Sequence, residues 1–487
     1  MDILLVTGVP SDPRIELIEV ESEIEKARAL LDHLLEKHIT IKRRINSHYS
    51  PILRLPAEIL SEIFMDCYPV NNREQWISDT PLLLGSICTV WRAAAWSISQ
   101  LWSTISLTIH EGVYSTDKFI LFRDWLARAC EQPLSLSVEY SSLSISDSDS
   151  LEHSTENQQI VSDALNLITQ RCKQWENVDL QMYQSLQALG HSFPEEFTHL
   201  KFLRLFGEEY RADDIKVFHS ASQLREVHLH IFDSPATAAL HFPQNPNMQL
   251  TLYGGTVHDC LHILRHRPNL VHFGIKNLLL PRISTIFEPA TAPFLQALEV
   301  AHVTMRNRHP SFETGAFKLL ANLTAPALHS LKIVSKDDSW FEALELAEFI
   351  SRSSCLLTKL SITCDSIDLG GCLSLTPALV ELHLCIDEMT EDDWMELAID
   401  EDPSPTTICF IVAPCLTHIT FTLTADGTLN CIGLARMAAS RRQPTPVSEY
   451  FSQLVEFNLV DFESSSEPFP FEVILEESVG LRKGEVW

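Results

Sequence analysis

Apolar residues recur along most of the chain in one short pattern: an apolar residue, any two residues, then two further apolar residues separated by one position. The eleven occurrences contain the pairs Val178/Leu180, Leu203/Leu205, Val227/Leu229, Leu250/Leu252, Phe273/Ile275, Leu298/Val300, Leu331/Ile333, Leu360/Ile362, Leu382/Leu384, Ile419/Phe421 and Phe457/Leu459. Because side chains alternate across a strand, each pair predicts a short strand with one buried face. Stretches with helical patterning lie between several pairs, at 212–223, 257–267, 317–323 and 341–353. The pattern therefore predicts an α/β fold in which strands and helices repeat as a solenoid.

The spacing of the occurrences supports this prediction. The first ones begin about 23 to 25 residues apart, a period typical of leucine-rich repeats, and the later ones require insertions. Two earlier strands, 103–109 and 134–140, are expected to begin the stack. We expect the Ser/Asp-rich segment 141–159 to form a surface loop, with a phosphorylation switch as the alternative, and 469–487 to cap the last repeat. A leucine-rich-repeat solenoid of parallel strands with helices would then occupy residues 103–487.

A second kind of apolar pattern marks residues 1–49. Between Leu17 and Ile45 the apolar positions fall at alternating steps of three and four, and no proline or glycine interrupts them. This seam consists of Leu17, Val20, Ile24, Ala27, Leu31, Leu34, His38, Ile41 and Ile45. It predicts a long heptad helix whose apolar stripe must be covered. Packing on the following domain and self-association as a coiled coil both remain open.

Residues 50–102 are expected to form a compact α-helical domain. Pro51 ends the long helix, since the residue before a proline avoids the α region, and Pro56 suits the first turn of a second helix. A polar connection follows, and then a further helix with apolar residues from Leu84 to Ala95. So short a segment cannot enclose all of its apolar side chains, so we expect part of its surface to face a partner.

The motifs of this segment resemble the F-box. They read Leu55-Pro56-x-Glu58-Ile59-Leu60, then Ile63-Phe64, then Cys88-x-Val90-Trp91-Arg92, then Leu101-Trp102. The order of a heptad helix followed by these motifs is similar to that in F-box proteins of mushroom-forming fungi. Two departures are Ile87, where a valine is common, and a connection between the helices longer than in the shortest F-boxes.

This resemblance implies a substrate receptor. An F-box docks on the Skp-type adaptor of a cullin–RING (SCF-type) ubiquitin ligase, and the repeats would hold an unknown client protein for ubiquitination. The residues implied to reach the adaptor are Leu55, Pro56, Ile59, Leu60, Ile63 and Trp91. For Trp91, as for Trp102, packing in the core is the alternative, because a buried indole most often serves packing.

Charge and composition narrow the class of partner. The chain has 65 acidic residues against 36 Lys and Arg, a net charge of −29, which disfavours nucleic acid and an anionic membrane surface. Only 15 of the 487 residues are glycine, which leaves little material for phosphate-binding loops. The first residues lack the features of a signal peptide, and no CxxC pair occurs among the 12 cysteines. We therefore expect free thiols and a cytoplasmic or nuclear protein.

The motifs of common catalytic sites are missing from the sequence: no G-x-S-x-G elbow, P-loop, H-E-x-x-H or dinucleotide fingerprint occurs. His258, His262 and His266 are four residues apart on one predicted helix, but apolar neighbours supply its buried face, which argues against a metal site. We expect a non-catalytic protein without cofactor or metal. The alternatives are a repeat scaffold whose F-box serves assembly outside a ligase, and an undetected enzyme built on the solenoid.

The positions between the apolar residues of each strand predict the face that a client would contact. They carry five acidic and four basic residues, so this face is almost neutral in a strongly acidic chain. The candidate client-binding residues are Arg204, His228, His230, His272, Lys276, Lys332, Lys359, His383 and His418. A pH-sensitive or acidic-peptide-binding groove is one interpretation. The other is that histidine is simply tolerated on a half-exposed sheet.

Overall fold

The chain divides into two compact units. The computed structural model describes residues 12–49, 51–67, 80–110, 116–141, 162–182, 196–207, 215–230, 235–245, 247–279, 286–303, 315–336, 340–341, 343–364, 366–388, 397, 413–428, 437 and 456–461. The helical unit is formed by Met1–Arg73 with Ser78–Leu101, and the strand unit by Glu74–Ile77 with Trp102–Trp487.

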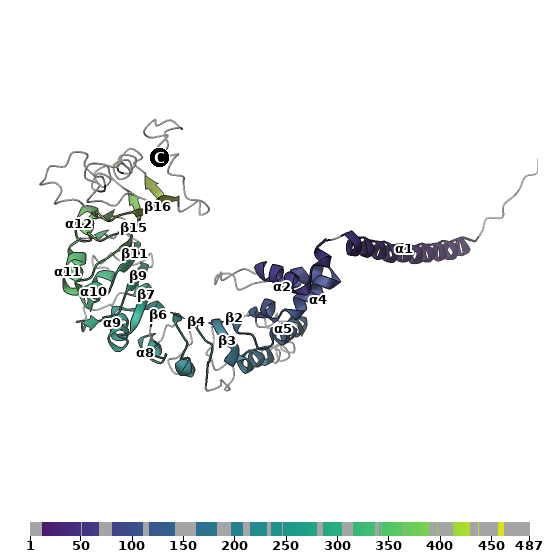
Figure 1. Cartoon of the computed structure of the whole chain (residues 1–487), viewed down its shortest axis with the longest axis horizontal. Coiled ribbons are helices and arrows are strands. Elements are labelled where there is room, and N and C mark those ends of the chain that lie inside the picture. The colour runs from purple at the N-terminus through teal and green to yellow at the C-terminus, as the bar shows by residue number, and fades with distance from the viewer. Residues whose placement is uncertain are drawn as a thin grey trace, which may run out of the picture. The chain divides into compact units, whose positions relative to one another are not determined.

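Prolines and a cysteine cap set the ends of the helices in the helical unit. Its helices are α1 (Pro13–Tyr49), α2 (Ala57–Asp66), α3 (Thr80–Ile87) and α4 (Thr89–Ser97), with a 3-10 turn at Pro51–Arg54 (Figure 1). Pro56 precedes α2 with extended backbone angles, φ −56° and ψ 152°. Cys88 caps α4, because its Sγ accepts a hydrogen bond from the backbone N–H of Trp91 at 3.4 Å.

A small apolar core holds α2 to α4 together. Leu60 and Phe64 of α2 are buried, and the ring of Phe64 lies 5.0 Å from the ring of Trp91 in α4. Leu84 of α3 and Ala95 of α4 are buried as well. These few contacts leave most apolar side chains of the unit at its surface.

The long helix α1 is exposed along its whole length. All nine residues of its heptad seam are exposed, with Leu17 at 57%, Leu31 at 56% and Ile45 at 50%. The helix predicted from the heptad pattern is therefore present. The seam does not pack on α2, α3 or α4, and it has no cover among the described residues of the helical unit.

The strand unit contains one 13-stranded sheet in which every strand is parallel to its neighbours and the spatial order follows the chain. The strands are β1 (Thr104–His110), β2 (Leu134–Ser141), β3 (Trp175–Met182), β4 (Phe202–Phe206), β5 (Glu226–His230), β6 (Met248–Thr256), β7 (Leu270–Leu279), β9 (Ala297–Val303), β11 (Ser330–Lys336), β13 (Lys359–Thr363), β15 (Glu381–Glu388), β16 (His418–Thr428) and β17 (Glu456–Asp461). The short strands β8 (Ala290–Thr291) and β10 (Leu323–Thr324) form a separate pair, as do β12 (Trp340–Phe341) and β14 (Ser366–Ile367). The predicted α/β fold with a repeating parallel sheet is confirmed.

Two continuous apolar ladders run across this sheet. The first includes Leu136, Val178, Leu203, Val227, Leu250, Phe273, Leu298, Leu331, Leu360, Leu382 and Ile419, which are register neighbours on successive strands. The second lies two residues further along each strand and includes Leu180, Leu205, Leu229, Leu252 and Ile275. The side chains named in both ladders are at most 2% exposed. Each repeat of the sheet therefore buries its apolar residues against the next repeat, as in a solenoid.

Helices cover the ladder side of the sheet. They are α5 (Thr116–Ala129), α8 (Pro235–Leu240), α9 (Val257–His266), α10 (Gly315–Ala321), α11 (Ala343–Ser353) and α12 (Leu369–Ser374). Figure 1 shows α8 to α12 along one side of the strands. Helix α9 begins with a capping box, in which Thr256 and Asp259 satisfy each other's backbone N–H groups, and it buries Val257, Cys260 and Leu264.

Three of the four helices predicted in this unit are present, as α9, α10 and α11. The fourth, predicted over 212–223, is wrong in extent: its described part forms a 3-10 turn at Lys216–Ser220 anchored by the buried Phe218. The turn ends at Ala221, whose backbone N–H donates to the carbonyl of Phe218. The expected loop 141–159, beyond Ser141, and the expected cap 469–487 lie outside the described residues. No described helix is both long and apolar enough to cross a membrane.

The ladders predict a large difference between the two faces of one strand. Leu252→Ala should lower the free energy of unfolding by about 2–5 kcal/mol, because Leu252 is fully buried and its loss leaves a cavity. Gln249→Ala on the same strand should change it by less than about 0.5 kcal/mol, because Gln249 is exposed. Urea unfolding followed by circular dichroism measures both. Equal losses in the two variants would contradict the ladder.

Candidate functional site

Polar side chains stand in register on the face of the sheet opposite the helices. The central row of this face consists of the residues between the two ladders, namely Ser137, Asp179, Arg204, His228, Thr251, Gly274, Glu299, Lys332, Ser361, His383 and Thr420. We call this row, with the positions two residues before and after it on each strand, the polar face. Neighbouring strands lie about 4.8 Å apart, so each side chain of a row can contact the next.

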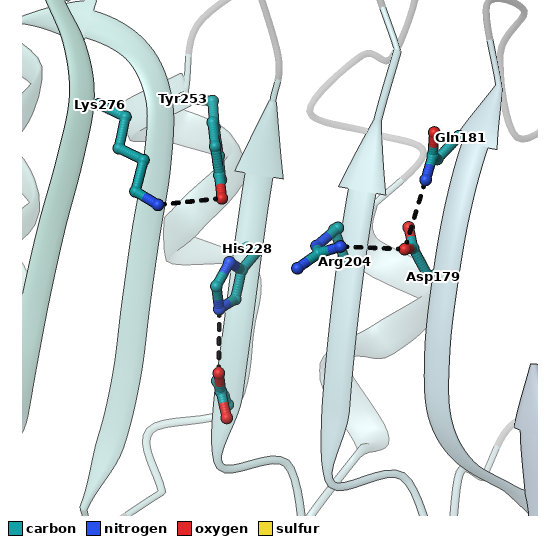
Figure 2. A network of polar contacts seen from close by, with 7 residues as sticks. Asp179, Gln181, Arg204, His228, Tyr253 and Lys276 are labelled. Carbon is teal, nitrogen blue, oxygen red and sulfur yellow. Dashed lines mark hydrogen bonds and ion pairs between the residues drawn. The ribbon is translucent and has the colours of Figure 1, made fainter. Parts of the chain in front are cut away.

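An ion pair between the buried Asp179 and the half-buried Arg204 lies at the start of this face. Arg204 donates from Nη1 to Oδ2 of Asp179 at 3.2 Å, and Gln181 donates to the same oxygen at 3.4 Å (Figure 2). Burial raises the pKa of the Asp179 carboxyl, and the nearby Arg204 guanidinium, the strongest opposing influence, lowers it. In the described part of the chain, Oδ1 of Asp179 and Nε of Arg204 are buried without a hydrogen-bond partner. The pair thus keeps an unused acceptor and an unused donor.

Beside this pair, aromatic rings and cations form what we call the cation–aromatic cluster. It comprises Phe202, Arg204, Phe206, His228, His230, Tyr253 and Lys276. The rings of Phe206 and His230 stack at 4.0 Å, and Nζ of Lys276 lies 5.1 Å from the ring centre of Tyr253. Figure 2 shows His228 directed toward a carboxylate on its own strand, that of Glu226, and its Nε2 lies 3.0 Å from Glu226 Oε1.

The composition of this cluster is typical of protein-binding surfaces. Planar rings offer a large contact area at low conformational cost, and Arg and Tyr are enriched among the residues that dominate protein–protein affinity. Four of the nine predicted client-binding residues belong to the cluster: Arg204, His228, His230 and Lys276. A fifth, His272 on β7, is half-buried beside it, and burial lowers the pKa of its imidazole.

The remaining four candidates lie on later strands. Their side chains form ion pairs with carboxylates or hydrogen bonds with hydroxyl groups. Lys332 pairs with Glu299 at 2.9 Å and Lys359 with Glu381 at 2.7 Å, each across to the neighbouring strand. The ring nitrogens of His383 lie 3.2 Å from Ser361 Oγ and 2.9 Å from Thr422 Oγ1, and His418 Nδ1 lies 2.7 Å from the hydroxyl of the adjacent threonine. The structure therefore divides the nine residues into two groups.

Sequence reasoning missed the aromatic members of the cluster. Phe202, Phe206 and Tyr253 occupy the same alternate strand positions as the chosen histidines, so alternation alone could have found them.

The predicted adaptor-binding residues differ in how much surface they offer. Pro56 and Ile59 are exposed, Ile59 at 41%, whereas Leu60 is buried at 3% in the core. Leu55, Ile63 and Trp91 are half-buried, and Trp91 packs on Phe64. Five apolar residues of α3 and α4 are exposed although they are not among the predicted adaptor-binding residues: Leu82 at 37%, Leu83 at 66%, Ile87 at 56%, Val90 at 48% and Trp96 at 44%.

The three histidines of α9, at positions 258, 262 and 266, lie side by side along the helix. The ring centres of His258 and His262 are 6.2 Å apart, and those of His262 and His266 are 4.2 Å apart. Burial lowers the pKa of His262, and electrostatic repulsion from His266, His258 and Arg265 lowers it further. Within the described ranges, no three potential ligands gather in a geometry that could hold a metal ion.

Protonation of His383 offers a test of the later strands. Burial, and then the nearby Lys332, lowers the pKa of His383. A histidine with a lowered pKa costs stability as pH falls below its unfolded pKa of about 6.5, because the unfolded state then binds more protons. The stability advantage of the natural chain over His383→Gln should therefore shrink between pH 8 and pH 5, measured by urea unfolding. A constant difference would contradict this assignment.

Two comparisons of the sequence with known proteins found no match. Neither a scan against models of protein families nor a search of curated proteins gives a match to the sequence.

Proposed function

We propose that this chain is the substrate receptor of a cullin–RING ubiquitin ligase. In this proposal residues 50–102, which include α2, α3 and α4, form an F-box that binds a Skp-type adaptor, and the strand unit is a leucine-rich-repeat solenoid that holds a client protein. The observation that carries the proposal is the division of the F-box-like motif between buried residues, such as Leu60 and Phe64, and the exposed apolar residues Pro56 and Ile59.

Two features of the helical unit support the proposed binding of an adaptor. The motif residues Leu60, Phe64 and Trp91 form its core, which gives the short helices a fixed arrangement. Pro56 and Ile59, from the same motif, are exposed on the first turn of α2. An apolar patch on a soluble protein is a typical docking surface, because a partner that covers it removes the patch from water. A motif divided in this way fits a domain built to bind an adaptor.

Two features of the strand unit support the proposed binding of a client protein. Thirteen parallel strands in chain order, with helices on one side and two apolar ladders, are the arrangement expected of a repeat solenoid. Such an array offers one long strand surface for recognition. On that surface, the cation–aromatic cluster carries the groups most suited to hold a protein segment.

The mechanism would be positional. The adaptor-bound helical unit and the client-bound strand unit would keep an acceptor lysine of the client near the ubiquitin-loaded enzyme, which raises its effective concentration. No residue of this chain makes or breaks a bond in such a scheme, and it needs no cofactor. We expect the assembly to work in the cytoplasm or the nucleus.

Binding to the adaptor tests the proposal directly. The full chain should co-purify with a recombinant Skp-type adaptor, and Ile59→Ser should weaken that binding at least tenfold by removing an exposed apolar contact. Glu62→Ser, an exposed position of the same helix, should leave the affinity nearly unchanged. Calorimetry gives the affinities, and circular dichroism checks that both variants are folded.

Two results of this experiment would contradict the proposal. One is a natural chain that does not bind the adaptor at all. The other is an Ile59→Ser variant that binds as tightly as the natural chain, which would place any contact away from the motif.

A further inference from the structure

The seam of α1 presents a continuous apolar surface with no cover in the described part of the helical unit. The helix has 37 residues and is therefore about 55 Å long. Its seam side chains are about half exposed throughout, from Leu17 at 57% to Ile45 at 50%. A long helix gains its stability in water mainly from packing such a stripe, so this surface requires a partner.

The seam has a regular heptad register. Its a positions are Leu17, Ile24, Leu31, His38 and Ile45, and its d positions are Val20, Ala27, Leu34 and Ile41. Two of these residues interrupt the apolar series: His38 is polar and large, and Ala27 is small. A partner helix must accommodate both interruptions.

Charge is segregated along the same helix. Between Asp12 and Glu25 there are six acidic residues and one basic residue, whereas between Lys37 and Arg44 there are four basic residues and no acidic one. The two ends of α1 are therefore complementary to each other. A second copy of the helix that runs in the opposite direction would bring the acidic end of each copy to the basic end of the other.

One antiparallel register pairs eight of the nine seam residues with one another, and leaves Leu17 opposite His48 at the end of the helix. Antiparallel coiled coils pair an a position of one helix with a d position of the other. With Ile24 opposite Ile41, Leu31 falls opposite Leu34 and Ile45 opposite Val20. His38 then falls opposite Ala27, so the largest polar residue of the seam meets the smallest apolar one.

The flanking positions agree with the same register. Glu21 and Lys42 are both e positions, which face each other in an antiparallel pair, and Glu23 and Arg44 are both g positions, which do the same. In a parallel pair each g position faces the e position five residues later on the other copy. That arrangement would set Lys37 against Lys42, and would bring two copies of His38 into one layer.

We propose that α1 pairs with α1 of a second copy of this chain as an antiparallel coiled coil. The chain would then be a dimer in which the C-terminal ends of the two α1 helices lie roughly 50 Å apart, at opposite ends of the pair. This inference is independent of the proposed function, since it uses only the residues of α1.

Charge reversal on the full chain tests both the pairing and its direction. The natural chain at about 20 µM and low salt should show about twice its mass of 55.1 kDa by light scattering. The double variant Lys42→Glu, Arg44→Glu should weaken self-association at least tenfold, because acidic groups would then face Glu21 and Glu23. Glu21→Lys, Glu23→Lys should do the same, and an equal mixture of the two variants should restore the dimer. Circular dichroism checks that each remains helical.

Matched controls separate the seam from total charge and from the adaptor motif. Lys26→Glu, Arg43→Glu makes the same change in net charge on the outer c and f positions and should remain dimeric. Ile59→Ser should also remain dimeric. A monomeric natural chain, a mass above a dimer, or unchanged association of the Lys42→Glu, Arg44→Glu variant would overturn the proposal. Tighter association of that variant would indicate a parallel pair, because the carboxylate introduced at position 42 would then face Lys37, and would overturn it equally.

Discussion

The apolar ladders are the constraint on which the strand unit depends. No single repeat can bury its own Leu, Val and Ile side chains, so each strand must lie parallel to the next in a register that aligns them. A shift by one residue would turn every ladder residue to the opposite face, so this register is strongly specified. The same register fixes which residues are neighbours on the polar face, because the positions between the ladders belong to the same strands and must follow the same alignment.

This fixed register explains the charge pattern of the polar face. A cation on one strand lies about 4.8 Å from the position beside it, so a carboxylate there stabilises it and a second cation would repel it. Asp179 with Arg204, Glu299 with Lys332, and Glu381 with Lys359 each form such a cross-strand pair. Three of the four basic residues of this face are therefore paired with a carboxylate, and the fourth, Lys276, lies over the ring of Tyr253. In the proposed function, recognition on this face would depend on shape and aromatic contact more than on long-range attraction.

The sequence predicts the repeating elements well because burial imposes a period on them. The eleven apolar pairs correspond to strands β3 to β17 of the sheet, and the heptad seam to α1. Contacts across strands were less predictable, since they depend on the ring orientation of residues such as His230 over Phe206. The motif residues of α2 share one stripe in the sequence, yet Leu60 is in the core and Ile59 at the surface, because neighbouring positions on a helix point in different directions. The 3-10 turn at Lys216–Ser220 was missed because a short apolar pattern does not distinguish such a turn from an α-helix.

The central claim is a division of labour in which the helical unit binds the adaptor while the polar face stays available to a client. Hydrogen exchange of the full chain, with and without a saturating Skp-type adaptor, measures this most directly, because it reports on both units in one experiment. The account predicts slower exchange in peptides from 55–67 and 80–97, with no change in 226–279. Protection in 226–279 instead, or no protection in 55–67, would contradict it.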